Sequence, residues 1–360
     1  MASNYLVLEN GSIMEGESFG YEGDCTGEVV FTTCAGGYQE IMTDPAQRGS
    51  ILVYTYPLIG NAGVTSDCDQ SDDVQVRGIV VKEYCTQLSP MYKGAPVSDY
   101  LREHKIPAIA GIDTRALTLL IREGGVLRGA IVTDRKKAED MAKKLSSMTS
   151  SMDDNLVSEV SVKKMKEIKN KKPITVGVLD CGAKYAVIEQ LSNRFNVIQF
   201  PYDTPAKVII DSGVKGLVVS DGPGNPAIKE LSGVSDAIKE VSKKMPVMGL
   251  GLGGCLTAIA FGAETVKMKF GHRGENQPVK IGGRILMTFQ NHGYEVDEKS
   301  LKGTGLIADE ININDKSIDG LKHESLPVMI CMYHPEAFPG PDDTMFKFDE
   351  FEALVKEAAQ

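Results

Sequence analysis

Apolar positions divide the chain into two parts with different rhythms. Over about the first 135 residues, short apolar segments alternate with turn residues, which predicts a β-rich domain with few helices. Two helices are expected there, at residues 113–125, with Asp113 as the N-cap and Gly124 near the end, and at residues 138–148. The segments expected to form strands are YLVLENGSIMEG (5–16), GEVVFTTCAGGYQEIM (27–42), SILVYTY (50–56) and VRGIVVKEY (76–84).

After Pro173, nearly continuous apolar strands alternate with helical segments. This pattern predicts a doubly wound α/β domain with a parallel sheet covered on both faces. Such sheets bind ligands beyond the carboxyl ends of their strands, where the loops DGPGNP (221–226) and GLGLGG (249–254) are expected. The expected strands lie at 174–181, 195–203, 216–221 and 246–250, and the expected helices at 183–193, 205–213, 230–244 and 254–263.

The domain organisation follows from this change of rhythm. A chain of 360 residues is long enough for two domains. Residues 146–172 are polar and end in six lysines within ten residues, which is typical of a solvated linker rather than a docking or anion-binding patch. We therefore expect an N-terminal domain over 1–145, a linker over 146–172 and an α/β domain over 173–360.

Composition limits the classes of function. The chain is 42% hydrophobic and 24% charged, has no apolar run of membrane-spanning length and no signal segment, so a cytoplasmic globular protein is expected. A net charge of −10 argues against nucleic acid as the main partner, although a local basic groove stays open. The seven cysteines are scattered and never spaced C-x-x-C, so we expect no disulfide framework and no metal site, and most of them buried.

The stretch MPVMGLGLGGCL (245–256) carries the clearest local motif. Gly249, Gly251 and Gly254 match G-x-G-x-x-G, which in dinucleotide-binding folds holds phosphates at a helix N-terminus. In those folds the loop follows the first strand, and an acidic residue about 20 positions later holds the ribose. Here the loop follows the fourth strand, and Glu264 and Glu275 lie before and beyond the expected position. The motif therefore does not predict a dinucleotide site.

A nucleophile elbow is the other interpretation of a strand, a sharp turn and a helix. Its usual form places the nucleophile between two glycines, as G-x-nucleophile-x-G. Gly249 and Gly253 supply the flanking glycines, so position 251 should carry the nucleophile. That position is glycine.

These residues identify a family resemblance over essentially the whole chain. The segments MGLGLGGCLTAIAFGAETVKMKFGHRGENQPV, SDGPGNPA, FQNHGYEVDE and MYHPEAFPGPDDT resemble the class I (triad) glutamine amidotransferase domain of carbamoyl-phosphate synthase small subunits. The segments GEVVFTTCAGGYQEIMTDPA, YPLIGNAG and AGIDTRALTLLIREGG resemble the N-terminal domain of that family. The resemblance implies an N-terminal small-subunit domain followed by an amidotransferase domain.

The resemblance also implies a chemistry and assigns residues to it. In this family a cysteine thiolate attacks the side-chain amide of glutamine, a histidine acts as base and then acid, and a glutamate orients the histidine. The histidine and glutamate fall on His334 and Glu336, and backbone N–H groups of Gly224 and Leu252 match the oxyanion hole. The glutamine-holding positions fall on Gly222, Gly224, Leu252, Asn291, Gly293 and Tyr294.

Four positions depart from the family pattern. The nucleophile becomes Gly251, a histidine of the following helix becomes Gly254, and the adjacent substrate-binding glutamine becomes Cys255. A serine that contacts substrate from the N-terminal domain becomes Ala46. Because glycine has no side chain, no thioester can form at 251, and we expect glutaminase activity to be impaired or absent.

Two functions from different classes follow. In the first, the chain is a non-catalytic small subunit that binds the large synthase subunit, in a complex that makes carbamoyl phosphate from ammonia, bicarbonate and ATP for arginine or pyrimidine synthesis. ATP and Mg would bind the large subunit, no cofactor is expected in this chain, and glutamine could be bound without hydrolysis. In the second, the chain is an active glutaminase that uses Cys255, about 5 to 6 Å beyond position 251 along the helix, or an unrecognised nucleophile.

Overall fold

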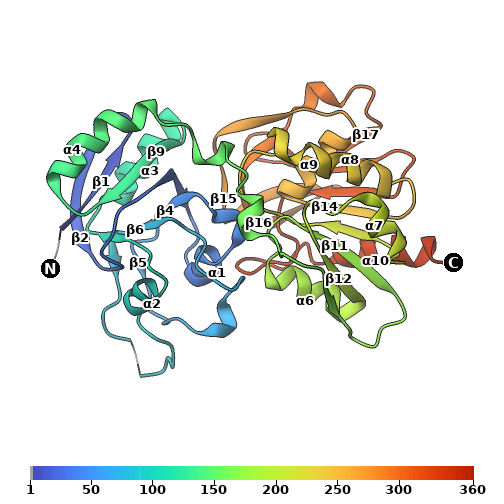
Figure 1. The fold of residues 1–360 in the computed structure, drawn as a ribbon, viewed down its shortest axis with the longest axis horizontal. Coiled ribbons are helices and arrows are strands. Elements are labelled where there is room, and N and C mark those ends of the chain that lie inside the picture. The colour runs from blue at the N-terminus through green and yellow to red at the C-terminus, as the bar shows by residue number, and fades with distance from the viewer. Residues whose placement is uncertain (1–2, 89) are drawn as a thin grey trace. The chain divides into compact units, whose positions relative to one another are not determined.

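The computed structural model describes residues 3–88 and 90–360 (Figure 1). The chain divides into two compact units, Met1–Asp154 and Asn155–Gln360. The expected linker, 146–172, is therefore shared between them. Part of it has regular structure, because it contains helix α5 (Val157–Val160) and strand β10 (Lys166–Ile168), and β10 pairs with a strand of the second unit.

The first unit is built on a closed barrel of seven strands. Its strands pair in parallel from β3 through β4 and β6 to β8, and antiparallel elsewhere. In barrel order the strands are β1 (Ser3–Leu8), β2 (Ile13–Ser18), β8 (Ala108–Ala110), β6 (Gly78–Val80), β4 (Ser50–Tyr54), β3 (Cys25–Thr32) and β9 (Leu127–Val132). The other elements are β5 (Leu58–Ile59), β7 (Glu83–Tyr84), α1 (Tyr38–Met42), α2 (Val97–Glu103), α3 (Thr114–Gly124) and α4 (Arg135–Lys144).

This β-rich unit agrees with the pattern of its sequence, with one correction. Both expected helices are present as α3 and α4, and Asp113 caps α3 by accepting a hydrogen bond from the N–H of Ala116 at 2.9 Å. The segment GYQEIM was expected to continue a strand, but it forms α1 instead. Gly37, at φ 65°, breaks the extended chain there, and Tyr38, Ile41 and Met42 are buried with helical spacing.

The second unit is built on a ten-stranded sheet. Five neighbouring strands run parallel: β12 (Asn196–Pro201), β11 (Thr175–Asp180), β13 (Leu217–Val219), β14 (Val247–Leu250) and β19 (Val328–Cys331). Strand β10 adds antiparallel to β12 at one edge. At the other side the sheet continues antiparallel through β18 (Ile318–His323), β17 (Leu306–Asn312), β15 (Thr265–Ile281) and β16 (Arg284–Val296).

Helices cover both faces of the parallel strands (Figure 1). One face packs on α7 (Ala206–Asp211), α8 (Ser232–Val241) and α9 (Leu252–Ala260), and the other on α6 (Tyr185–Arg194) and α10 (Phe346–Ala358). Successive residues of β11 point to opposite faces of the sheet, so Val178 packs in the core on the α6 side and Leu179 in the core on the α8 side. The predicted doubly wound α/β architecture is therefore confirmed.

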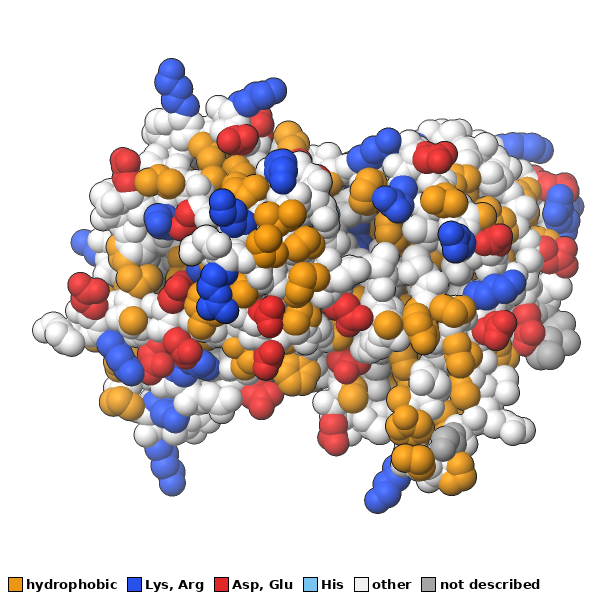
Figure 2. Space-filling model, turned by 180° about the vertical axis from the view of Figure 1, so that it is seen from behind, with side chains coloured by type: hydrophobic (Ala, Val, Ile, Leu, Met, Phe, Trp, Pro, Cys, Tyr) orange, Lys and Arg blue, Asp and Glu red, His pale blue; other side chains and the backbone are white. Residues whose placement is uncertain are grey.

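Three features of the structure bear on the expectations drawn from composition: the distribution of surface charge, the state of the cysteines and the length of the apolar helices. On the face drawn in Figure 2, basic side chains are scattered singly among acidic ones and form no continuous tract. All seven cysteines are free thiols, and four of them are buried. Among the described residues, no helix combines the length and the apolar character needed to cross a membrane.

Candidate functional site

The turn at Gly251 has the geometry of a nucleophile elbow. It connects the end of β14 to the start of α9, and Gly251 adopts φ 48° and ψ −114°. Side chains are strained at such a positive φ, whereas glycine tolerates it. The N–H of Gly251 donates to the carbonyl of Cys331 at 2.9 Å, which ties the turn to the neighbouring strand β19. The elbow is therefore formed, although it carries no nucleophile.

The neighbouring glycines are explained by close packing. A Cβ atom at Gly253 would lie 2.3 Å from the carbonyl oxygen of Val219, so α9 approaches the end of β13 too closely for a side chain. At Gly254 a Cβ would lie 2.8 Å from Cγ2 of Ile330. Within the G-x-G-x-x-G pattern, Gly249 and Gly254 therefore lie where α9 packs closely on the sheet, whereas Gly251 takes the positive φ of the turn.

The carboxylate of Asp221 lies in the space beside the elbow. A Cβ atom added at Gly251 would lie 2.1 Å from its Oδ1 and 2.8 Å from its Oδ2. Oδ1 accepts a hydrogen bond of 2.6 Å from the N–H of Leu252, the group that the resemblance assigns to the oxyanion hole. The Asp221 carboxylate therefore lies where a side chain at position 251 would begin, and it is hydrogen-bonded to the Leu252 N–H.

His334 and Glu336, predicted as base and orienting carboxylate, lie together as the sequence implies. Nδ1 of His334 is 2.8 Å from Oε1 of Glu336, and Nε2 is 3.2 Å from Oδ2 of Asp221. This second contact is an ion pair without hydrogen-bond alignment, since Oδ2 of Asp221 has no hydrogen-bond partner. Lys184, at the carboxyl end of β11, completes the row with Nζ 3.2 Å from Oε1 of Glu336 and donating to the carbonyl of Ala337 at 3.0 Å.

The row Asp221, His334, Glu336 and Lys184 is removed from water, with side-chain exposures of 7%, 3%, 0% and 1%. Burial and the charge of Lys184 act against the charged form of His334, but the charge of Glu336, the close approach of Asp221 and the hydrogen bond to Glu336 outweigh them and raise the pKa of the ring to about 9. Burial also acts against ionised Glu336, yet Lys184 and His334 lower its pKa to about 2. At neutral pH, His334 is thus a protonated ring between two carboxylates.

The predicted glutamine-holding residues occupy three segments of the second unit, one of which is Leu252 at the start of α9. Gly222 follows Asp221 and leaves no space for a side chain, because a Cβ would lie 2.1 Å from the carbonyl oxygen of Cys181. Gly224, in the same loop, has φ 91°. Asn291, Gly293 and Tyr294 lie on β16, whose residue Phe289 accepts a hydrogen bond of 2.9 Å from the N–H of His334. Ala46 belongs to the first unit, in a short turn capped by Asp44.

Cys255 lies inside the hydrophobic core. It is 1% exposed on α9 and packs in a cluster with Ala258, Ile330 and Met332. Burial, followed by the charges of Asp221 and Glu295, raises the pKa of its thiol well above the ordinary value. It is therefore a buried, protonated thiol, one of the two roles considered for it from the sequence.

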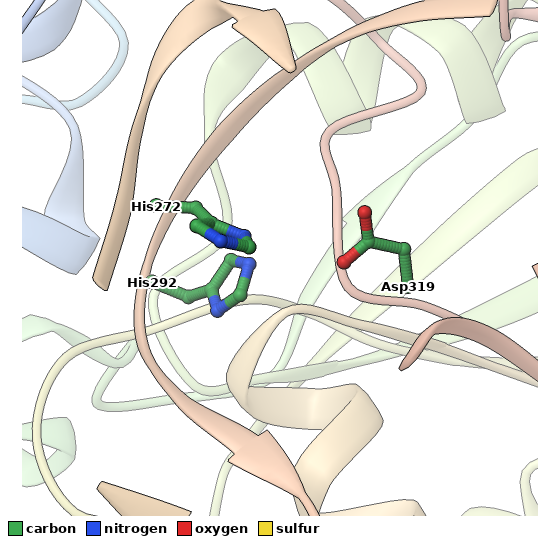
Figure 3. A group of neighbouring side chains, drawn as sticks. All are labelled: His272, His292 and Asp319. Carbon is green, nitrogen blue, oxygen red and sulfur yellow. The ribbon is translucent and has the colours of Figure 1, made fainter. Parts of the chain in front are cut away.

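Several members of the site are not apparent from the sequence. Asp221 is visible only as the first residue of the DGPGNP loop, and Lys184 as a lysine following the first α/β strand. The sequence also predicts no metal site, whereas the structure groups His272, His292 and Asp319 with ligand atoms within 4.8 Å of one another (Figure 3). These three residues lie on different strands, and no local spacing connects them.

Comparisons with known proteins agree with this division of the chain. The family model for the carbamoyl-phosphate synthase small chain, CPSase domain, matches residues 6–131, and that for class I glutamine amidotransferases matches residues 177–354. The carbamoyl phosphate synthase small chain of Archaeoglobus fulgidus is 40% identical over 98% of each chain. The pyrimidine-specific small chain of Bacillus subtilis is 41% identical over 98% of this chain and 95% of its own.

Among solved structures, the glutaminase domain of Trypanosoma brucei CTPS, with bound acivicin, is similar to 51% of this chain and 94% of its own, at 16% identity and a TM-score of 0.41. The two family models together cover most of the sequence, and the curated relatives match from end to end. The chain belongs to the carbamoyl-phosphate synthase small-chain family, with a class I glutamine amidotransferase domain in its second unit.

Proposed function

We propose that the chain is a non-catalytic small subunit of carbamoyl-phosphate synthase, assembled with a large subunit in a complex that takes its nitrogen from free ammonia. The observation that carries this proposal is the position of Asp221. Its carboxylate stands beside Gly251, accepts the Leu252 N–H and pairs with His334. In this proposal the nucleophile is absent, and Asp221 binds the two groups that would have assisted it, the Leu252 N–H and His334.

The charge state of the row supports loss of glutaminase activity in a second way. A general base must be able to accept the proton of the nucleophile. His334 already carries a proton at neutral pH, because its pKa is raised to about 9, and it faces two carboxylates rather than a thiol. Without a thiol at position 251 the charged ring has no partner that could form a covalent intermediate.

An active glutaminase that uses Cys255 has less support. Attack on an amide needs a thiolate within about 3 to 3.5 Å of the reacting carbon and aligned with it. The Cys255 thiol is enclosed by apolar side chains, and its raised pKa keeps it protonated. Glutamine binding without hydrolysis is disfavoured on similar grounds, since Asp221 already holds the Leu252 N–H.

Reconstitution with the large subunit tests the proposal. Carbamoyl phosphate synthesis is measured with ammonium or with glutamine as the nitrogen donor, and glutamate release is followed in parallel. We expect synthesis with ammonium alone, no glutamate release, and no effect of His334→Asn on the ammonium-dependent rate. Synthesis from glutamine that disappears in Cys255→Ala would establish the alternative instead.

The purified chain, without the large subunit, tests glutamine binding. A ligand that binds only the folded state raises the melting temperature, and the rise continues with the logarithm of ligand concentration beyond saturation. We expect no change in melting temperature across millimolar glutamine for the chain alone. A rise that Asp221→Ala enlarges would indicate that the pocket still accepts glutamine in competition with the carboxylate.

A further inference from the structure

Three strands of the second unit bring together a pair of histidines and a carboxylate that are not part of the row at the elbow. His272 on β15 and His292 on β16 are directly opposite each other in the antiparallel register, and Asp319 lies on β18. All three side chains are buried, and each offers a ligand atom within 4.8 Å of the others. Figure 3 shows the two rings side by side, with the carboxyl group of Asp319 across from them.

Each imidazole is oriented by an acceptor on its outer side. Nε2 of His272 is 2.7 Å from a carboxylate oxygen of Asp315, and Nδ1 of His292 is 2.9 Å from the carbonyl oxygen of Tyr294. Because these partners only accept, each ring directs an N–H outwards. Histidines that bind metals are characteristically held in this way, by a carboxylate or a backbone carbonyl.

On the inner side both rings face another acceptor. Nδ1 of His272 and Nε2 of His292 lie 2.7 Å and 3.1 Å from Oε1 of Gln290. The amide is held in this orientation because its nitrogen donates to Oδ2 of Asp319 at 2.7 Å. A neutral imidazole has a single N–H, so with that hydrogen used outwards the inner nitrogens present lone pairs to an oxygen.

The two inner nitrogens face the same amide oxygen, and the ring centroids are 5.2 Å apart. A cation between the inner nitrogens would satisfy both lone pairs at once. Asp319 adds the required negative charge, and its buried Oδ1 has no hydrogen-bond partner.

We propose that His272 Nδ1, His292 Nε2 and Asp319 Oδ1 form a binding site for a divalent transition-metal ion of the zinc class. Two imidazoles and one carboxylate suit such ions better than Mg²⁺ or Ca²⁺, which prefer oxygen ligands. Gln290 Oε1 is within reach as the fourth ligand. Bond lengths of about 2.0 to 2.2 Å place tetrahedral donors about 3.4 Å apart, so ligand atoms now up to 4.8 Å apart would draw together and Gln290 Oε1, 2.7 Å from Nδ1 of His272, would move back.

The site lies beside a hollow, and an ion bound there would have a structural role. A hollow of about 280 Å³, lined by Glu295, Asp315 and Ser317 among others, borders the outer partner of His272. A bound ion would pin β15, β16 and β18 together. His292 stands between Asn291 and Gly293, so this pin would also fix the segment of β16 that the family resemblance assigns to glutamine. The site is nevertheless separate from Gly251, and its test does not depend on the proposed function.

The test uses the full chain, stripped of metal with a chelator and titrated with Zn²⁺ and with Co²⁺. We expect retention of about one ion per chain, a higher melting temperature with Zn²⁺, and a visible Co²⁺ absorption typical of nitrogen and oxygen ligands in a four-coordinate site. Failure to retain either ion overturns the proposal. So does a sulfur-to-cobalt charge-transfer band, which would assign binding to cysteine.

Two variants and one control locate the ion. Asp319→Asn removes a charged ligand at nearly constant shape and should weaken metal binding at least about 10-fold. Asp315→Asn changes a more exposed residue and should weaken metal binding about 10-fold, because His272 loses the carboxylate that orients it. His104→Gln is the matched control, because it removes a histidine–aspartate pair of 2.6 Å in the other unit and should leave affinity unchanged. Unaltered affinity in both aspartate variants overturns the proposal.

Discussion

At the scale of single residues, Asp221 and Gly251 depend on each other. A side chain at 251 meets two obstacles, the positive φ of the turn and an oxygen of Asp221 only 2.1 Å from its Cβ. Asp221 in turn is held by the Leu252 N–H and by the charge of His334. A buried carboxylate without such partners would be costly, so the pairing of glycine with aspartate forms a stable arrangement.

Placing a reactive thiol at the elbow should therefore need two changes. Gly251→Cys alone places the thiol against the Asp221 carboxylate, which raises the thiol pKa and slows its reactions. We expect Gly251→Cys combined with Asp221→Ala to react with iodoacetamide at least about 10-fold faster at position 251, measured at neutral pH by peptide mass spectrometry. Gly283→Cys, in an open turn, is the control for an accessible thiol. Equal rates in the single and double variants would contradict the arrangement.

His334 should make stability depend on pH. Its pKa is about 9 in the folded chain against 6.5 for the free side chain, so its contribution is complete below about pH 6.5 and lost as the pH rises through 9. The loss is on the order of 3 kcal/mol, at about 1.4 kcal/mol for each pKa unit. Urea unfolding between pH 6.5 and 9.5 should show a steeper fall in wild type than in His334→Gln. Parallel curves would mean that His334 is not held as a cation.

At the scale of elements, α9 is positioned by its glycines. Gly253→Ala would place a methyl group 2.3 Å from the carbonyl oxygen of Val219, and we expect it to lower the free energy of unfolding by at least about 1 to 3 kcal/mol. Gly233→Ala in α8 is the matched control, because nothing lies within 4 Å of its added Cβ. There the gain in helix propensity should leave stability unchanged or raise it by up to about 1 kcal/mol. Urea denaturation of both variants measures the difference.

The spacing of apolar residues predicted the strands and helices whose formation depends mainly on that spacing. The apolar runs of β11 to β14 and the helices between them were predicted, since strands covered on both faces and amphipathic helices each have a characteristic period. The segment Tyr38–Met42 was wrongly assigned to a strand, because five residues are too few to separate the two periods. The long hairpin of β15 and β16 and its bulges depend on cross-strand register, which sequence spacing does not determine.

In the candidate site, too, residues in contiguous motifs were predicted from the sequence, whereas contacts between separate strands were not. His334, Glu336 and the elbow were identified because each belongs to a contiguous motif. The approach of Asp221 to Gly251, and of Lys184 to Glu336, joins the ends of different strands. Those contacts arise only from the order of strands in the sheet. Sequence therefore indicated which groups were missing, but not which group took their place.

At the scale of the whole molecule, the second unit begins before the parallel sheet does. Val157 of α5 is buried in its core, and the N–H of Val162 donates to Asp180 at 2.8 Å. Strand β10 completes the sheet edge beside β12. These contacts place residues 155–172 within the folded unit rather than in a free connection.

Two fragments test this boundary. We expect residues 155–360 to unfold cooperatively and at a higher urea concentration than residues 173–360, which lack α5 and β10. Burial of Val157 alone is worth about 1.5 to 3 kcal/mol. Circular dichroism across a urea series gives both midpoints, and coincident midpoints would show that residues 155–172 contribute nothing to the unit.

The Asp221 carboxylate also has a consequence for how the subunit responds to changes in metabolite concentration. A group tethered next to its own binding site has an effective concentration that can reach millimolar or higher, independent of the supply of metabolites. Under the proposed function, Asp221 would act as an inhibitor that is part of the chain itself. The conformation of this domain should stay the same in nitrogen-rich and nitrogen-poor cells, and its partner would receive a constant scaffold in place of a glutamine-dependent signal.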